Sequence, residues 1–220
     1  MDLFGAALND HFHGRSKGPL VVCADEFEEP LDVGFYLAET PEQFELDMFK
    51  HLKGRILDVG CGAGRILKYL QKKGCDASGF DVSPLAIRTC EERGIGKARG
   101  SHEDEDQGGV YDVILFMNRT IGTAGSLDGV EALLGRCRSW CAPDGVLIFD
   151  SLEIMPEKAN AGPGLWRHIL HFEYGGAAGD PWPYVHFTSG VAEVLLKKTG
   201  WRRLHAVTSG DRYALVCGKV

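Results

Sequence analysis

Short apolar runs alternate with amphipathic stretches through the middle of the chain, from residue 55 to residue 149. Strands are predicted at 55–59, 77–81, 112–117 and 146–149, with a weaker signal near 97–100. The continuous apolar run at 112–117 is typical of a strand that is covered on both faces. Apolar positions spaced three and four residues apart predict helices at 65–73, at 84–94 and through Val130, Leu133, Leu134 and Cys137. Strands that alternate with helices in this way are typical of a doubly wound parallel sheet.

The last part of the chain predicts a different strand direction. Residues 201–208 and 212–219 are two β-type runs joined by the turn Ser209-Gly210-Asp211, which predicts a hairpin. We therefore expect an α/β fold with a seven-stranded, mostly parallel sheet. Its antiparallel strand is 212–219, which lies between its neighbours.

Two further regions depart from the alternation. Residues 1–39 are predicted to be irregular apart from a strand at 20–23. A helix is expected to begin at Thr40-Pro41-Glu42-Gln43, with Thr40 as its cap, and to end at Gly54. Residues 152–188 mix glycine and proline with aromatic residues, and we expect an insertion with one or two strands before a helix at 191–198.

The length and composition favour one soluble domain. The chain has 220 residues and a net charge of −7, which suits a single α/β domain over residues 1–220. Within it we expect an N-terminal flap at 1–39 and a substrate lid at about 152–188. The acidic balance argues against nucleic acid as a partner. No apolar run has the length of a membrane span, and the N-terminus lacks a basic signal-peptide region.

The seven cysteines are scattered and form no Cys-x-x-Cys pair. This pattern favours reduced thiols that act as small core residues, and a cytoplasmic location. We expect no metal, because the spacing of zinc ligands is missing from the sequence. The oligomeric state expected is a monomer or a homodimer.

Candidate chemistry begins with the loop Asp58-Val59-Gly60-Cys61-Gly62-Ala63-Gly64 after the first predicted strand of the alternation. Its glycines permit a tight turn and a close approach to a ligand, and the following helix directs its free N–H groups to the same place. A dinucleotide fingerprint would place its third glycine at position 65, which is Arg65 here. Asp81 ends the second strand, 21 residues after Gly60, where a carboxylate can accept both hydroxyls of a ribose.

Four segments in this order, ILDVGCGAGR, GFDVSP, YDVILFMN and APDGVLIFD, resemble the successive motifs of class I S-adenosylmethionine-dependent methyltransferases. The resemblance covers about residues 40–150, and the C-terminal hairpin fits it. It implies S-adenosyl-L-methionine as the cofactor and a Rossmann-like methyltransferase fold. It also implies transfer of a methyl group from the cofactor sulfonium by in-line displacement, without a covalent enzyme intermediate.

The resemblance also assigns roles to individual residues. The glycine loop would pass under the methionine part of the cofactor, with Asp58 holding its amino group. Asp81 would bind the ribose, and Val82 the adenine ring. The family often has an acidic residue at the adenine edge where this chain has Ser101 and His102, with Glu103 and Asp104 as alternatives. Asn118 would lie beside the sulfonium. The cofactor-binding residues thus expected are Asp58, Gly60, Cys61, Gly62, Gly64, Asp81, Val82, Ser101, His102 and Asn118.

The substrate is expected to be a small molecule with a nitrogen or oxygen nucleophile. The chain has Asn118-Arg119-Thr120-Ile121 where enzymes that methylate the amino groups of DNA bases have an [DN]PP[YF] tetrapeptide. It contains no Pro-Cys dipeptide of the DNA cytosine-5 type. His168, His186 and Tyr36 are candidates for a catalytic base, although packing is the commoner role for each. An aromatic wall of Trp166, Trp182, Tyr184 and Phe187 could face an amine or a planar ring.

Two alternatives remain open at this stage. One is a non-catalytic or regulatory protein that binds S-adenosylmethionine, because a cofactor motif does not reveal turnover. The other is a nicotinamide-dependent oxidoreductase, against which the position of the third glycine argues.

Overall fold

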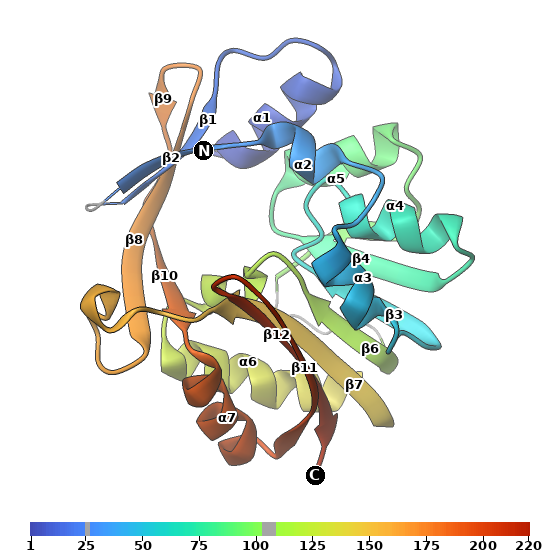
Figure 1. Cartoon of the computed structure of the whole chain (residues 1–220). Helices are drawn as coiled ribbons and strands as arrows, with labels where there is room; N and C mark the ends of the chain where they lie inside the picture. Colours follow the sequence, from blue (N-terminus) through green and yellow to red (C-terminus); the bar gives the residue numbers. More distant parts are fainter. Residues whose placement is uncertain (25–26, 103–108) are drawn as a thin grey trace. The chain divides into compact units, whose positions relative to one another are not determined.

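The computed structural model describes residues 1–24, 27–102 and 109–220 (Figure 1). The chain divides into two compact units. Unit 1 comprises Met1–Pro41, Gly60–His102 and His168–Trp182. Unit 2 comprises Glu42–Val59, Glu103–Arg167 and Pro183–Val220.

The N-terminal part of unit 1 is more regular than its sequence predicts. Its elements are α1 (Leu3–Phe12), β1 (Leu20–Ala24), β2 (Phe27–Leu31) and α2 (Val33–Leu37). The prediction of an irregular segment at 1–39 was therefore wrong, although the strand at 20–23 is confirmed. The amphipathic pattern of α1 is too short to predict a helix clearly. The helix is stabilised by tertiary packing, because Leu3, Ala7 and Leu20 form a buried cluster with Tyr174. The Asp2 carboxylate caps the helix by accepting a hydrogen bond from the Gly5 N–H at 2.9 Å.

The rest of unit 1 contains the second and third predicted strands. Its elements are α4 (Arg65–Lys72), β4 (Asp76–Asp81), α5 (Pro84–Glu92), β5 (Ala98–Gly100), β9 (Ala177–Ala178) and most of β8 (Leu165–Tyr174). Strands β4 and β5 are parallel. Helix α5 begins where the sequence predicts, with Ser83 as its cap and Pro84 in its first turn.

Unit 2 contains the buried centre of the sheet and its antiparallel end. Its elements are α3 (Gln43–Phe49), β3 (Arg55–Val59), β6 (Tyr111–Phe116), η1 (Thr120–Ala124), α6 (Leu127–Trp140), β7 (Cys141–Leu152), η2 (Pro156–Lys158), most of β10 (Trp182–Phe187), α7 (Ser189–Lys198), β11 (Trp201–Ser209) and β12 (Arg212–Lys219). Strands β3, β6 and β7 are parallel. Strand β12 is antiparallel to both β7 and β11. Figure 1 shows helices α6 and α7 beside these strands.

Strand pairing gives a seven-stranded sheet in the order β11-β12-β7-β6-β3-β4-β5. This order confirms the expected mostly parallel sheet with its antiparallel C-terminal strand between two neighbours. A second sheet has the order β10-β8-β1-β2, and β9 pairs with β8. Residues 152–188 therefore contribute three strands, β8, β9 and β10, where one or two were expected. The extra strand is the two-residue β9, too short to give a periodic sequence signal.

Helix α3 ends at Phe49 instead of the expected Gly54. Two other boundaries differ from the sequence prediction for identifiable reasons. Helix α3 is capped at Glu42 rather than Thr40, because the Glu45 carboxylate accepts a hydrogen bond from the Glu42 backbone N–H at 2.8 Å. Strand β7 begins at Cys141, five residues before the expected strand at 146–149. There the pairing moves from Tyr111 opposite Cys141 to Val113 opposite Val146, so the extra residues form an irregularity within the strand.

Within the described parts of the chain, no helix is both long enough and apolar enough to cross a membrane.

Candidate functional site

The glycine loop of unit 1 has a backbone that ordinary residues rarely adopt. Gly60, Gly62 and Gly64 have φ angles of 70°, 54° and 77°, in the left-handed region that glycine enters without steric penalty. The backbone N–H groups of Gly60 and Cys61 both donate to the Phe80 carbonyl, at 2.9 and 3.0 Å. The loop is thereby attached to the end of β4 and leads into α4.

Gly64 has a second reason to be glycine. A Cβ atom at this position would lie 2.5 Å from Ile95 Cδ1 and 3.0 Å from Cys90 Sγ. Both contacts are shorter than normal carbon–carbon and carbon–sulfur separations. The third glycine of the loop therefore packs the start of α4 closely against the region around α5.

Asp81 lies at the end of β4 with both carboxylate oxygens held by backbone groups. Oδ2 accepts a hydrogen bond from the Gly62 N–H and Oδ1 one from the Ser83 N–H, each at 2.8 Å. Burial raises the pKa of Asp81 above its ordinary value, and the nearby charge of Asp2 adds to that shift, whereas the backbone N–H groups of Ser83, Gly62 and Val82 oppose it. A carboxylate offers about four accepting positions, so the side chain is fixed in place and still able to bind a ligand.

The start of α1 is attached to the residues that follow Asp81. The Asp2 Oδ2 atom accepts hydrogen bonds from the Ser83 hydroxyl at 2.7 Å and from the Leu85 N–H at 3.1 Å. The Phe4 ring lies 3.9 Å from the place where a Cβ of Gly62 would stand. The expected flap therefore contributes an aromatic ring directly beside the glycine loop.

Tyr36, one of the three candidate bases, lies in α2 among aromatic rings of the same segment. Its ring makes edge contacts with Phe4 at a centroid separation of 5.1 Å and with Phe35 at 5.3 Å. The Arg65 guanidinium at the start of α4 lies 4.2 Å from the centre of the Phe35 ring. The structure thus brings Tyr36 close to the glycine loop within unit 1.

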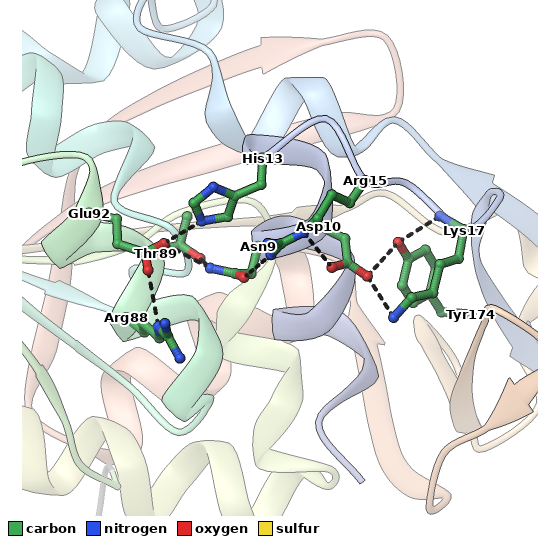
Figure 2. A network of polar contacts seen from close by, with 9 residues as sticks. All are labelled: Asn9, Asp10, His13, Arg15, Lys17, Arg88, Thr89, Glu92 and Tyr174. Atoms are coloured by element: carbon green, nitrogen blue, oxygen red, sulfur yellow. Dashed lines mark hydrogen bonds and ion pairs between the residues drawn. The ribbon is translucent and has the colours of Figure 1, made fainter.

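A network of polar side chains holds the other end of α1 (Figure 2). Asn9 Nδ2 donates to Thr89 Oγ1 at 3.1 Å and to Glu92 Oε2 at 3.0 Å, so α1 is joined to α5. Asp10 Oδ2 lies 3.0 Å from Lys17 Nζ and accepts a hydrogen bond from the Tyr174 hydroxyl at 3.2 Å. Helix α1 is therefore tied to α5 on one side and to β8 on the other.

The remaining site residues of unit 1 follow β4 and β5. Val82 is 56% exposed, which is unusual for a large apolar side chain next to a buried strand. The Ser101 N–H donates to the Asp81 carbonyl at 3.2 Å, and its hydroxyl donates to the His102 carbonyl at 3.3 Å. The exposed His102 closes the described part of this loop. Glu103 and Asp104, the alternatives for an acidic contact, lie outside the described residues.

In unit 2, the predicted residues Asp58 and Asn118 lie near the ends of β3 and β6. Asp58 is buried and pairs in register with Leu115. Asn118 and Arg119 follow β6 with φ angles of 56° and 64°. Asparagine tolerates this left-handed conformation better than most residues, whereas for arginine it is strained.

Two side chains hold the strained Arg119 residue in place. Its N–H donates to Asp150 Oδ1 at 2.8 Å, and its carbonyl accepts a hydrogen bond from the Tyr184 hydroxyl at 2.6 Å. Tyr184 belongs to β10, within the expected lid. A side chain of β10 therefore helps to fix the turn that contains Asn118.

Asp150 was not among the site residues expected from the sequence. It is fully buried at the end of β7, and burial raises its pKa, with the Arg119 N–H and the Arg212 charge acting in the opposite direction. Arg212 Nη2 lies 3.5 Å from Asp150 Oδ2, and Arg212 Nη1 lies 2.8 Å from Glu42 Oε2. A carboxylate directly after an apolar strand was the available signal, but its cationic partner is 62 residues away.

The two candidate histidines belong to different units. His168, in β8, is 5% exposed and packs edge-on against Phe27 in unit 1. His186, in β10, lies between Trp166 and Tyr184 in unit 2, at centroid separations of 5.8 and 4.9 Å. Both imidazoles are packed against aromatic rings.

Comparison with known families decides the class to which these features belong. Residues 35–190 match the family model described as a methyltransferase domain. The match covers more than half of the chain and includes the glycine loop, Asp81 and Asn118. The chain belongs to this methyltransferase family. Membership confirms the class expected from the sequence, an S-adenosylmethionine-dependent methyltransferase, and with it the expected cofactor.

Individual relatives agree with the family. The methyltransferase domain is 30% identical over 133 residues to a ubiquinone biosynthesis O-methyltransferase from Azorhizobium caulinodans, covering 56% of this chain and 51% of that protein. The chain thus spans about half the length of this curated relative.

Solved structures share the fold. One is an S-adenosylmethionine-dependent methyltransferase from Bacteroides fragilis in complex with S-adenosyl-L-homocysteine. It has 23% identity and a TM-score of 0.89 over 99% of this chain and 94% of that chain. A sugar N-methyltransferase from Streptoalloteichus sp. has 15% identity and a TM-score of 0.57 over 82% and 87% of the two chains.

Proposed function

We propose that this methyltransferase transfers the methyl group of S-adenosylmethionine to a nitrogen or oxygen nucleophile of a small molecule. The observation that carries the proposal is the Asp81 carboxylate. Two backbone N–H groups hold it, one on each oxygen, next to a left-handed glycine loop, and a carboxylate can accept about four hydrogen bonds in all.

The residues of unit 1 fit the chemical groups of the cofactor. In the proposal, Asp81 accepts the two ribose hydroxyls and the exposed Val82 side chain covers one face of the adenine. Gly60, Cys61, Gly62 and Gly64 leave room for the methionine part, since glycine backbone carries no Cβ. Ser101 and His102 border the adenine edge. Asp58 and Asn118 are proposed to hold the cofactor amine and to border the sulfonium.

The cofactor supplies a methyl group on a positively charged sulfur, and the protein needs only to align the acceptor and exclude water. Alignment of two reacting groups is worth up to roughly 7–11 kcal/mol in well-oriented cases. We propose that residues 1–39, through Phe4 and Tyr36, shield the cofactor from solvent. We propose that residues 152–188 form the substrate lid, with Tyr184 positioning the turn that contains Asn118.

The acceptor class rests on relatives and on the candidate bases. One relative is a ubiquinone biosynthesis O-methyltransferase, and one structural neighbour is a sugar N-methyltransferase. Both names describe methylation of small molecules at oxygen or nitrogen. Among Tyr36, His168 and His186, we favour Tyr36, in its phenolate form, as the group that receives the proton of the acceptor. Its ring packs on Phe4, which borders the glycine loop.

Replacement of Asp81 by alanine tests the cofactor assignment. Hydrogen bonds to a charged group are worth about 1.5–3 kcal/mol each, and water replaces part of that. We expect Asp81→Ala to weaken S-adenosylhomocysteine binding by about 2–4 kcal/mol, or roughly 30- to 1000-fold in the dissociation constant. Calorimetric titration measures this change.

The matched control is Asp76→Ala. Asp76 begins the same strand and pairs with Lys97 at 2.6 Å, at the opposite end of β4 from Asp81. This variant should bind the cofactor product as the wild type does. Equal affinity of Asp81→Ala and wild type would refute the ribose assignment.

A second assay separates the enzyme from a protein that only binds the cofactor. Purified protein is incubated with S-adenosylmethionine and a panel of small amines, phenols and acids, and formation of S-adenosylhomocysteine is measured. Turnover with a panel member supports the proposed acceptor class. Tight cofactor binding without turnover on any member of the panel would favour the regulatory alternative.

A further inference from the structure

Three side chains with metal-binding atoms meet on one face of the sheet in unit 1. They are Cys23 of β1 and His171 and Glu173 of β8, and one ligand atom of each lies within 4.8 Å of the other two. The sequence separates Cys23 from the other two by almost 150 positions. This is why cysteine spacing alone predicted no metal.

The strand register explains the meeting of the three side chains. Cys23 is directly opposite His171 in the antiparallel pair β1–β8, so their side chains project from the same face of the sheet. Glu173 lies two residues after His171 along the strand and therefore projects from that face as well. On the other side of β1, Cys23 is directly opposite Glu28 of β2, which extends the same row of side chains by a second carboxylate.

This face of β8 is distinct from the face that packs in the core. On the opposite face of β8, His168, Leu170 and Tyr174 are buried. Ile169, which projects from the same face as His171, is 57% exposed. Cys23 is 5% exposed, and the Glu173 side chain is 55% exposed. The thiol therefore lies at the base of the cluster, and the carboxylate lies at its solvent side.

The separations suit a small divalent cation. His171 Nε2 lies 3.6 Å from Glu173 Oε1. Metal–ligand distances of about 2.0–2.3 Å for nitrogen, oxygen and sulfur on zinc place neighbouring ligands of a tetrahedral site about 3.3–3.6 Å apart. Small side-chain rotations would therefore bring all three atoms onto one ion.

The donor set also indicates which kind of cation would bind. A thiolate, an imidazole and a carboxylate together suit zinc and similar borderline ions better than magnesium or calcium, which prefer oxygen ligands alone. Glu28 of β2 is directly opposite Cys23, and a ligand atom of Glu173 of β8 lies within 4.8 Å of the Cys23 sulfur. Two acidic groups therefore face the sulfur from strands on both sides of it, where a cation would relieve their repulsion of the thiolate.

We propose that Cys23, His171 and Glu173 form a binding site for a zinc-like divalent cation, with Glu28 or water as the fourth ligand. The ion would join β1, near the N-terminus, to β8 within unit 1. Its role is separate from the proposed methyl transfer, since none of the residues assigned to the cofactor is a ligand.

Zinc titration of tag-free, chelator-treated protein tests the site without any use of methyltransferase activity. Isothermal calorimetry of the wild type should show one Zn²⁺ per chain. Replacing a ligand, in Cys23→Ser or His171→Asn, should weaken that binding by more than about 10-fold. Co²⁺ in place of Zn²⁺ should give a thiolate-to-cobalt absorption band that Cys23→Ser abolishes.

Two controls separate this cluster from other thiols and histidines. Cys75→Ser changes a partly exposed cysteine, and His13→Gln changes a histidine paired with Glu92 at 2.8 Å. Both controls should bind Zn²⁺ as tightly as the wild type. Zinc should also raise the melting temperature of the wild type and of both controls, but not that of Cys23→Ser.

Glu173→Gln keeps the proposal testable if replacement of the buried cysteine impairs folding. Its side chain is more than half exposed, so the variant should fold normally and still lose zinc affinity. Zinc affinity that is unchanged in Cys23→Ser, His171→Asn and Glu173→Gln would overturn the proposal, as would a wild type that binds no Zn²⁺ at micromolar concentration. In either case His171 and Glu173 would form an ordinary surface ion pair.

Discussion

At the scale of single residues, Asp81 combines a fixed carboxylate with a raised pKa. The carboxylate accepts both ribose hydroxyls most strongly when it is ionised. The pKa of Asp81 lies above the ordinary value of 3.8. As the pH is lowered, cofactor affinity should therefore begin to fall at a higher pH than it would with an aspartate of ordinary pKa. We expect S-adenosylhomocysteine binding to strengthen as the pH rises through this raised value. Calorimetry across mildly acidic to neutral pH measures the effect, and Asp81→Asn should remove it.

The stability of the unliganded protein should change in the opposite direction. The folded state binds the Asp81 proton more tightly than the unfolded state does. The contribution of Asp81 to the free energy of unfolding is therefore greatest below pH 3.8 and decreases as the pH rises through the raised pKa. The pKa of Asp150 is also raised, so Asp150 changes stability with pH in the same direction. The contribution of Asp81 is therefore obtained as the difference in free energy of unfolding between wild type and Asp81→Asn at each pH. A difference that is constant with pH would contradict the raised pKa.

Gly64 offers a test of backbone conformation with an internal control. Gly64 and Gly74 have the same φ angle of 77°, but an added Cβ meets Ile95 and Cys90 only at Gly64 and nothing within 4 Å at Gly74. A left-handed conformation costs an alanine roughly 1–2 kcal/mol. We expect Gly74→Ala to lose about that much free energy of unfolding and Gly64→Ala to lose clearly more, as measured by chemical denaturation. Equal losses would mean that the contacts of Gly64 adjust without cost.

At the scale of elements, the turn after β6 depends on a hydroxyl from β10. Tyr184→Phe removes the hydrogen bond to the Arg119 carbonyl, which should cost about 0.5–1.5 kcal/mol of stability. Because Arg119 is strained and follows Asn118, we also expect a lower rate of methyl transfer. Steady-state kinetics with a substrate from the panel, together with thermal melting, measure both effects.

Tyr213→Phe is the matched control for Tyr184→Phe. The Tyr213 hydroxyl donates to the Phe187 carbonyl at 2.7 Å and also interacts with Ser151, so the variant loses a bond of the same type that does not end on Arg119. It should lose a similar amount of stability and keep its rate of methyl transfer per folded molecule. Equal losses in the rate of methyl transfer in the two variants would contradict a positioning role for Tyr184.

At the scale of the whole molecule, ordered strands occupy much of the proposed lid. Strands β8, β9 and β10 account for most of residues 165–187, whereas 153–164 contains only the short helix η2 and many exposed residues. Since regular hydrogen-bonded segments open rarely, protease cleavage of the unliganded protein should concentrate at 153–164. Mass spectrometry of the fragments identifies the sites, and first cleavage within β8 or β10 would contradict the expectation.

Cofactor alone should affect the glycine loop more than the lid. Hydrogen exchange of the Gly60–Gly64 backbone should slow on addition of S-adenosylhomocysteine, while exchange at 153–164 changes little. Equal protection of both segments would mean that the lid responds to the cofactor without a substrate.

The sequence by itself determined the alternation of strands and helices, the antiparallel end of the sheet and the methyltransferase class. These features depend on local signals. Examples are the apolar run of β6, the Ser83-Pro84 start of α5, and glycines that must adopt positive φ angles between β3 and α4. Such signals act over a few residues, so a single chain displays them directly. The separation of Asp81 from Gly60 along the chain can be read from the sequence for the same reason, because one helix and one strand, α4 and β4, connect the two residues.

Only the tertiary structure decided the features that depend on distant partners. Helix α1 is regular because its apolar side packs with Leu20 and Tyr174, and its sequence alone is too short to show this. Asp150 meets Arg212 because β7 and β12 pair in antiparallel register. Cys23 meets His171 because β1 pairs with a strand from the other end of the chain. Register and packing bring these side chains together, and neither is encoded in the spacing of the residues along the sequence.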